Sequence, residues 1–170
     1  MKTTAPSSTA PRLRLSSPPS GLGLFLRYWL PVLLWMLLIF GLSTTAGSPR
    51  NTSRIIGPIV RWLVPGISDD AVGKVVLTVR KAAHVSEYAV LALLSWRARR
   101  KPVRRDHRPW HWSEAAFALA VAVLFAVTDE WHQTFVPSRE GSPRDVLIDA
   151  GGATLALLAL WRFGRWRKRW

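Results

Sequence analysis

From about Leu24 to Leu42 the chain is almost entirely apolar. At roughly 1.5 Å per helical residue, a run of this length crosses a hydrocarbon core of about 30 Å. A cleaved signal peptide also contains an apolar run, and Thr44-Thr45-Ala46 could serve as its cleavage site. Because this run is longer than the apolar region of a usual signal peptide, we favour an uncleaved membrane anchor.

Three later segments extend this pattern to a polytopic membrane protein. Ser68, followed by Asp69 and Asp70, is typical of a helix N-cap with an acidic first turn, and the helix it opens is predicted to reach about Trp96. The apolar content of residues 75–96 makes it the second span, and further spans are predicted at about 114–131 and 145–163. The fold class is therefore predicted to be an all-α integral membrane bundle of four transmembrane helices.

The distribution of charge predicts how this bundle lies in the membrane. The formal net charge is +14, although 49% of the residues are hydrophobic. Basic residues gather in the short connection 97–108 and after residue 161, which is typical of cytoplasmic loops and unlike a nucleic-acid surface. Placing both termini and this connection in the cytoplasm collects about sixteen of the 24 Lys and Arg residues there. We predict a multi-pass protein of the cytoplasmic membrane with cytoplasmic termini, the lipid bilayer as a partner and no nucleic-acid partner.

The remaining segments define the domain boundaries. Residues 1–22 are rich in Ser, Thr and Pro and are predicted to form a disordered tail, residues 23–165 the membrane domain, and residues 166–170 a basic tail. Within the loop 43–68, residues 54–64 have two interpretations that stay open, a short helix in the membrane interface or a partly ordered connection. The absence of cysteine excludes disulfides, thiolate catalysis and cysteine metal sites.

Ionisable residues interrupt three of the predicted spans at a similar depth. Taking Trp96, Trp112 and Trp161 as markers of the inner interface, His84 and Asp149 lie roughly 18 Å above it, and residues 81, 129 and 145 roughly 22 to 26 Å above it. Because an isolated charge in hydrocarbon is costly, these side chains should face inward and form a polar pocket open to the extracytoplasmic side. The small residues 150–153 would let the fourth helix pack closely against a neighbour at this level.

The polar residues of the three later spans and of the loop after residue 131 form one pattern. It reads Lys81-x-x-His84-x-x-x-Tyr88, then Asp129-Glu130-x-x-Gln133-x-Phe135-x-Pro137-x-Arg139, then Asp145-x-x-x-Asp149-x-x-Gly152. This pattern resembles the VanZ-like family of small bacterial membrane proteins. The resemblance covers roughly residues 30–159. It implies a small helical membrane domain, and some members of the family are associated with resistance to glycopeptide antibiotics such as teicoplanin. Two positions depart from the family pattern, since many members are expected to have Asn where Asp149 stands and Gly where Ala156 stands.

Several functions are compatible with such a pocket. The first hypothesis is binding of an envelope lipid headgroup or of a cell-wall precursor, with Lys81 and Arg139 holding a phosphate or carboxylate and the acidic residues holding an amine or hydroxyl. The candidate pocket residues are Lys81, His84, Tyr88, Asp129, Glu130, Gln133, Arg139, Asp145 and Asp149.

The alternatives come from other functional classes. A membrane-embedded hydrolase or transferase acting on a lipid-linked phosphate could use a divalent metal, for which His84, Asp129 and Asp145 are candidate ligands, although no His-Glu-x-x-His motif and no Gly-Lys-Ser/Thr phosphate loop occur. A salt-bridge network that only fixes helix packing is the structural alternative. Transport is the weakest alternative, because four helices without an internal repeat leave little to line a path. The sequence names no cofactor and no oligomeric state.

Overall fold

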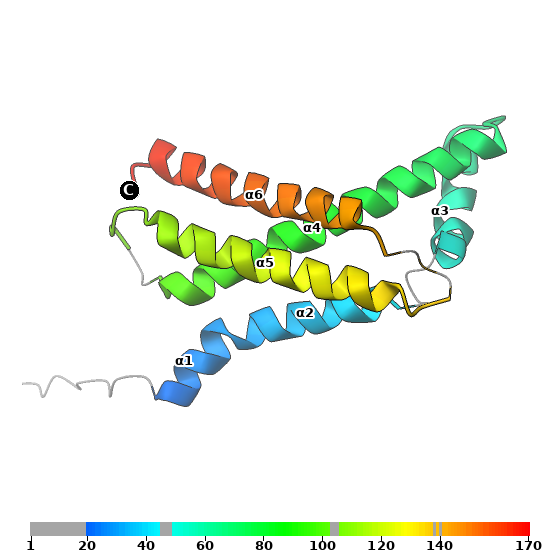
Figure 1. Ribbon diagram of the computed structural model, residues 1–170. Coiled ribbons are helices and arrows are strands. Elements are labelled where there is room, and N and C mark those ends of the chain that lie inside the picture. The colour runs from blue at the N-terminus through cyan, green and yellow to red at the C-terminus, as the bar shows by residue number, and fades with distance from the viewer. Residues whose placement is uncertain (1–19, 45–48, 103–105, 138, 140) are drawn as a thin grey trace, which may run out of the picture.

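The computed structural model describes residues 20–44, 49–102, 106–137, 139 and 141–170, and the described part of the chain is helical without a strand. The helices are α1 (Gly21–Tyr28), α2 (Leu30–Leu42), α3 (Pro49–Leu63), α4 (Asp69–Arg100), α5 (Trp112–Gln133) and α6 (Pro143–Trp166). In Figure 1, the start of α1 and the end of α6 lie at the same end of the bundle, and α3 lies at the opposite end. The predicted disordered tail 1–22 falls almost wholly outside the described residues.

The first predicted span is a pair of helices that meet at Trp29. Pro31 has no backbone N–H, so the carbonyl of Arg27, four residues earlier, loses its helical partner. The Arg97 guanidinium of α4 donates to this carbonyl at 3.0 Å instead. The Trp35 indole N–H of α2 also donates to the Glu87 carbonyl of α4 at 2.9 Å. The bend between α1 and α2 therefore exposes a backbone acceptor that ties the N-terminal pair to α4.

Residues 54–63 belong to helix α3, so the interpretation of this segment as a partly ordered connection is wrong, and the expected helix is confirmed up to Leu63. One side of α3 packs against α4, where Gly57 is buried and lies close enough that an added Cβ would contact Val72. Large apolar side chains are exposed elsewhere along the helix, among them Ile55, Ile59 and Trp62. This amphipathic pattern is typical of a helix that lies in a membrane interface.

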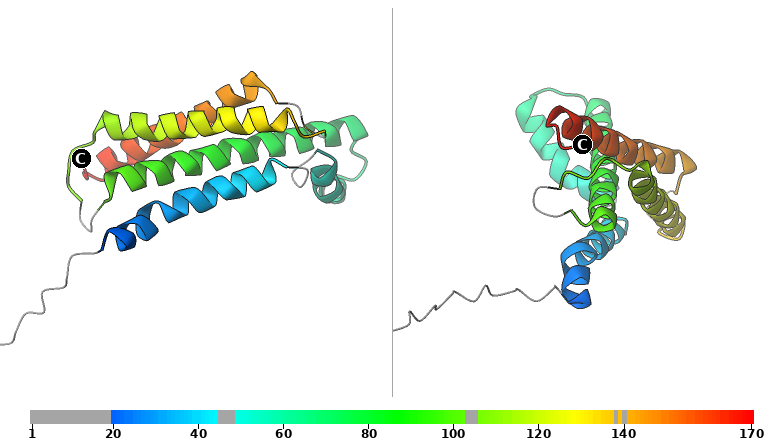
Figure 2. Two further views of the ribbon diagram at one scale, coloured as in Figure 1. Left: turned by 60° about the horizontal axis from the view of Figure 1, so that its bottom comes forward. Right: turned by 90° about the vertical axis from the view of Figure 1, so that its left-hand side faces the viewer.

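Helix α4 is the element around which the others pack. The predicted N-cap is confirmed, since the Ser68 hydroxyl accepts from the Ala71 amide at 3.3 Å with Asp69 and Asp70 in the first turn. The helix continues to Arg100, four residues beyond the predicted end at Trp96, and Lys101 ends it in a left-handed conformation. It contacts α2, α3, α5 and α6, and Figure 2 shows α2 and α5 on different sides of it.

Close packing between helices depends on small residues. Along α5, Ala115, Ala118, Ala122 and Ala126 recur at spacings of three and four and are buried. Opposite faces carry exposed leucines, such as Leu124 on α5 and Leu155 on α6. Apolar side chains on the outside and small ones between helices are the arrangement expected of a bundle surrounded by lipid.

Three helical segments among the described residues are long and apolar enough to cross a membrane, namely Gly21–Leu42, Trp112–Gln133 and Pro143–Trp166. They correspond to the first, third and fourth predicted spans. The second predicted span lies in α4, which does not meet the same criterion because Arg80, Lys81 and Glu87 interrupt its apolar sequence. The apolar helices indicate a membrane protein with three candidate spans, and the role of α4 depends on what its charged side chains face.

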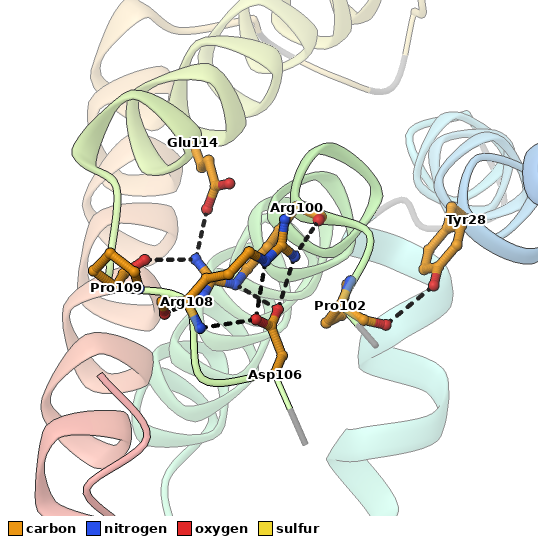
Figure 3. A network of polar contacts seen from close by, with 7 residues as sticks. All are labelled: Tyr28, Arg100, Pro102, Asp106, Arg108, Pro109 and Glu114. Carbon is orange, nitrogen blue, oxygen red and sulfur yellow. Dashed lines mark hydrogen bonds and ion pairs between the residues drawn. The ribbon is translucent and has the colours of Figure 1, made fainter. Parts of the chain in front are cut away.

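At the end of the bundle where α1 begins and α6 ends, a buried arginine organises the connection between α4 and α5 (Figure 3). The Arg100 side chain is 1% exposed and donates to Asp106 Oδ2 at 3.1 Å and to Glu114 Oε2 at 2.9 Å. It also donates to the carbonyls of Arg108 and Pro109. The connection that the sequence indicated only as a basic loop is thus held at residues 106–114 by four hydrogen bonds from the Arg100 guanidinium.

Tryptophans cover the same end of the bundle. The rings of Trp112 and Trp161 lie 5.6 Å apart, and Trp96 stacks on Trp110 at 5.5 Å. Trp170 folds back so that its ring lies 5.3 Å from that of Trp110. The three tryptophans taken as markers of one interface therefore belong to one end of the structure.

We expect acid to weaken this connection through Asp106. Hydrogen bonds from Arg108, together with the nearby Arg100 guanidinium, hold the pKa of the Asp106 carboxyl well below its usual range. A depressed pKa adds stability that is complete above the pKa of an unfolded Asp, about 3.9, and is lost as the pH falls below it. Thermal unfolding in detergent should therefore show a smaller loss between pH 6 and pH 3 in Asp106→Asn than in wild type. Equal losses in both proteins would contradict this role.

Candidate functional site

At the end of the bundle opposite the start of α1 and the end of α6, a cavity of about 500 Å³ is surrounded by α4, α5, α6 and the loop after α5. Basic, acidic and amide side chains from all four segments line it, and apolar residues complete the wall. The lining residues are Leu77, Arg80, Lys81, His84, Glu130, Gln133, Pro137, Arg139, Asp145, Ile148 and Asp149.

One ion pair spans the cavity between α4 and α6. The Lys81 ammonium lies 2.7 Å from Asp145 Oδ1, and both side chains are about two-fifths exposed. Asp145 stands in the first turn of α6, where a carboxylate also interacts favourably with the helix dipole. The two residues neutralise each other, so Lys81 is not free to bind an anion without giving up Asp145.

Behind the cavity, Asp129 is bound from two helices. Its Oδ2 accepts from the Ser43 hydroxyl at 2.7 Å and from the Gln133 amide at 3.1 Å, and the residue is 1% exposed. The fully buried Tyr88 lies beside it, and the Tyr88 hydroxyl has no hydrogen-bonding partner of ordinary geometry among the described residues. Asp129 and Tyr88 therefore support the cavity from behind and do not line it.

Glu130 is held in place by two neutral donors. Gln133 donates to its Oε1 at 3.1 Å, and the backbone amide of Ser142 donates to its Oε2 at 2.9 Å. Gly141 makes the second contact possible, because a Cβ at that position would lie 2.2 Å from the Glu130 carbonyl oxygen. The loop between α5 and α6 thus fixes the orientation of the carboxylate without neutralising its charge.

Two further residues meet the cavity without conventional partners. Asp149 is 1% exposed, and neither carboxylate oxygen has a hydrogen-bonding partner among the described residues. His84 Nδ1 is also buried, and its nearest ionic neighbour is Glu87 Oε2 at 4.0 Å. Buried polar atoms are nearly always satisfied in folded proteins, so an unpartnered pair facing a cavity indicates a place for a ligand.

The position of Asp149 against His84 depends on Gly152. An added Cβ at Gly152 would lie 2.7 Å from the Val85 carbonyl oxygen and 3.2 Å from Val85 Cα. The backbone of α6 therefore touches that of α4 one turn away from Asp149 and next to His84. The predicted close approach of the small-residue segment is confirmed at Gly152 and at the fully buried Ala153. Gly151 instead faces outward, and an added Cβ there would meet no neighbouring atom within 4 Å.

Two arginines, Arg80 and Arg139, also line the cavity. Arg139 donates to the Leu42 carbonyl at 2.5 Å, and its Nε is buried without a partner. Neither Arg80 nor Arg139 forms an ion pair with a carboxylate of the described residues, whereas Lys81 does. Arg80 was not among the predicted site residues, although an arginine inside a predicted span is costly enough to have indicated it.

The sequence-predicted residues thus separate into two groups. Lys81, His84, Glu130, Gln133, Arg139, Asp145 and Asp149 line the cavity, while Tyr88 and Asp129 lie behind it. Of the candidate metal ligands, only His84 belongs to a group with suitable geometry. The other members of that group are Glu130 and Asp149, and neither Asp129 nor Asp145 belongs to it.

Comparisons with known proteins agree with the pattern of polar residues. The family model VanZ-LLP1, described as VanZ/LLP1, matches residues 25–164. No curated protein and no solved structure matches the chain. The matched range includes every residue that lines the cavity.

Proposed function

The chain belongs to the VanZ/LLP1 family, and we propose that it binds, in its polar cavity, the anionic group of an envelope lipid headgroup or of a cell-wall precursor. The observation that carries this proposal is the pair of arginines, Arg80 and Arg139, that face the cavity without carboxylate partners among the described residues. Guanidinium groups bind phosphate and carboxylate in bidentate geometry. In a membrane protein, an unpaired arginine is costly and is a functional candidate.

The pairing of the charged groups disfavours a purely structural network. Such a network would pair the charged groups with one another, as Lys81 and Asp145 do. Arg80, Arg139 and Asp149 instead remain without ionic partners among the described residues. These groups are therefore available to a ligand. We propose that Arg80 and Arg139 bind the anion, whereas the sequence had suggested Lys81 and Arg139.

We further propose that α4 crosses the membrane as the fourth span. It runs alongside α2, α5 and α6 (Figures 1 and 2), and its residues Arg80, Lys81 and His84 line the cavity between the helices. The basic connection after α4 and the basic end of α6 then lie in the cytoplasm by the positive-inside rule. The cavity would open to the extracytoplasmic side of the cytoplasmic membrane, where lipid-linked envelope precursors are displayed.

Such binding offers a route to antibiotic susceptibility. A protein that holds the exposed part of a cell-wall precursor would change how much of it glycopeptides such as teicoplanin can reach. Expression of wild type and of Arg139→Ala in a susceptible host, at matched protein levels, tests this consequence. Equal susceptibility of the two strains would contradict this effect on antibiotic susceptibility, but it would leave the proposed binding to be tested by the binding assay.

We expect Arg139→Ala to weaken binding of a phosphate-bearing lipid by at least about tenfold, since hydrogen bonds to charged groups contribute about 1.5 to 3 kcal/mol. The measurement is binding of a polyprenyl phosphate to the protein in nanodiscs. Uncharged polyprenol of the same length reports the contribution of the lipid chain, and a soluble muramyl pentapeptide distinguishes a peptide carboxylate from a lipid phosphate.

Arg144→Ala is the matched control for this experiment. Arg144 is exposed in the first turn of α6 and does not line the cavity. Its replacement removes the same charge near the same opening and should leave binding close to wild type. An equal loss of affinity in both variants would mean that the arginines act only by general electrostatic attraction. Unchanged affinity in both variants would contradict the proposal.

A further inference from the structure

The cavity contains a group of potential metal ligands contributed by three helices. His84 of α4, Glu130 of α5 and Asp149 of α6 each offer one ligand atom, and these atoms all lie within 4.8 Å of one another. Donor atoms around a zinc ion, each at about 2.0 to 2.2 Å, lie roughly 3 to 4 Å apart. Small side-chain rotations would therefore bring the three atoms onto one ion.

Asp149 is the independent indication that this group receives a cation. Its carboxylate is buried and faces the cavity, with neither oxygen hydrogen-bonded among the described residues. A buried carboxylate without donors is strongly unfavourable unless a proton or a cation compensates it. Lys81 does not compensate the Asp149 carboxylate, because it is paired with Asp145. The other acidic member of the group, Glu130, adds a second negative charge.

The other two members are arranged as metal ligands usually are. The Glu130 carboxylate is oriented by Gln133 and by the Ser142 amide, and each of its oxygens keeps a further lone pair. Such outer contacts hold ligands of bound metals in position. The His84 ring is partly buried beside Glu87, and imidazole nitrogen is a preferred ligand of zinc but not of magnesium or calcium.

We infer that His84, Glu130 and Asp149 form a binding site for a divalent transition-metal ion, with Zn²⁺ the best match to one imidazole and two carboxylates. Three protein ligands leave a fourth coordination position facing the cavity. This inference extends the anion-binding proposal. It rests on that proposal only for the identity of the ligand at the fourth coordination position, and the three protein ligands are inferred independently of it. A bound cation would offset Glu130 and Asp149, which otherwise repel an anionic group held by Arg80 and Arg139.

The test is Zn²⁺ binding to the full chain in detergent after treatment with a chelator, measured by calorimetry and by metal content after dialysis. Wild type should bind one Zn²⁺ per chain, and Asp149→Asn should bind it at least about tenfold more weakly. Glu130→Gln keeps an oxygen that can accept from Ser142 and should give a similar loss, so that the test survives if one variant fails to fold. Size-exclusion profiles and thermal unfolding report folding.

Asp70→Asn is the matched control, because Asp70 is exposed in the first turn of α4 and lies outside both the cavity and the group of three. The affinity of this variant for Zn²⁺ should stay near that of wild type. Three results would overturn the inference, namely absence of Zn²⁺ binding by wild type, unchanged binding by Asp149→Asn and Glu130→Gln, or an equal loss in Asp70→Asn. Equal affinity for Mg²⁺ would overturn the assignment to a transition metal.

Arg139→Ala separates this inference from the proposed function. The variant should retain Zn²⁺ binding while losing the polyprenyl phosphate. Zn²⁺ binding by wild type without lipid binding would leave the metal site standing and remove the proposed function. Lipid binding by a wild-type protein that binds no Zn²⁺ would leave the proposed function standing and remove the metal site.

Discussion

Replacing Arg100 with methionine should lower the free energy of unfolding by about 3 to 5 kcal/mol, the usual cost of breaking a buried ion pair from one side. The Arg100 side chain is 1% exposed and contacts the carboxylates of Asp106 and Glu114. Methionine keeps most of the volume but none of the donors, so these carboxylates and the carbonyls of Arg108 and Pro109 lose a partner together. Unfolding in detergent by titration with sodium dodecyl sulfate, followed by tryptophan fluorescence, measures the change.

Arg99→Met is the control for this prediction. Arg99 is adjacent in α4 and exposed, and its main contact is the face of the Phe117 ring at 5.4 Å. A cation–π contact at an exposed site contributes only about 0.5 to 1 kcal/mol. A loss in Arg100→Met no greater than that in Arg99→Met would mean that the network in Figure 3 does not stabilise the connection between α4 and α5.

Replacing Gly152 with alanine should destabilise the bundle by about 1 to 3 kcal/mol, as overpacking of a tight interface does. The new methyl group would meet the backbone of Val85, which cannot move aside as a flexible side chain can. Helix α6 would have to shift away from α4, which would also separate Asp149 from His84. We therefore expect the same variant to lose Zn²⁺ affinity, and both the unfolding and the calorimetric assays apply.

Gly151→Ala provides a control of opposite sign. Gly151 is exposed, and no atom lies within 4 Å of an added Cβ. Because alanine is the better helix former, this replacement should raise stability by up to about 1 kcal/mol. Destabilisation by Gly151→Ala comparable to that by Gly152→Ala would show that the helix, and not its contact with α4, is sensitive to a side chain here.

The elements of the fold were largely predictable from local patterns. The apolar run after residue 24 and the N-cap at Ser68 are properties of short stretches, and the structure places helices there with ends within a few residues of those expected. The bend at Trp29 was not predicted, although Pro31 indicated that one backbone carbonyl would lose its partner. The helical form of residues 54–63 was undecided, because amphipathic stretches of this length gain their stability from what they pack against.

The candidate site was predictable in composition but not in its pairing. Depth along the helices indicated that Lys81, Asp145 and Asp149 belong to one region, and all three line the cavity. The depth of a residue does not determine the direction of its side chain. Asp129 was expected in the pocket, but it lies behind the pocket and accepts hydrogen bonds from Ser43 and Gln133. The candidate metal ligands changed for the same reason, with Glu130 and Asp149 beside His84 in place of Asp129 and Asp145.

By itself, the sequence determined the helical class, the membrane character and the family, because length, apolarity and motif spacing are written along the chain. The tertiary structure decided which charges neutralise one another. Helix rotation and the contact between Gly152 and Val85 set those distances, and they arise from packing between segments far apart in sequence. Lys81 forms an ion pair with Asp145, whereas Arg80, Arg139 and Asp149 have no ion-pair partner among the described residues. Only the geometry between helices determines which charged residues are paired.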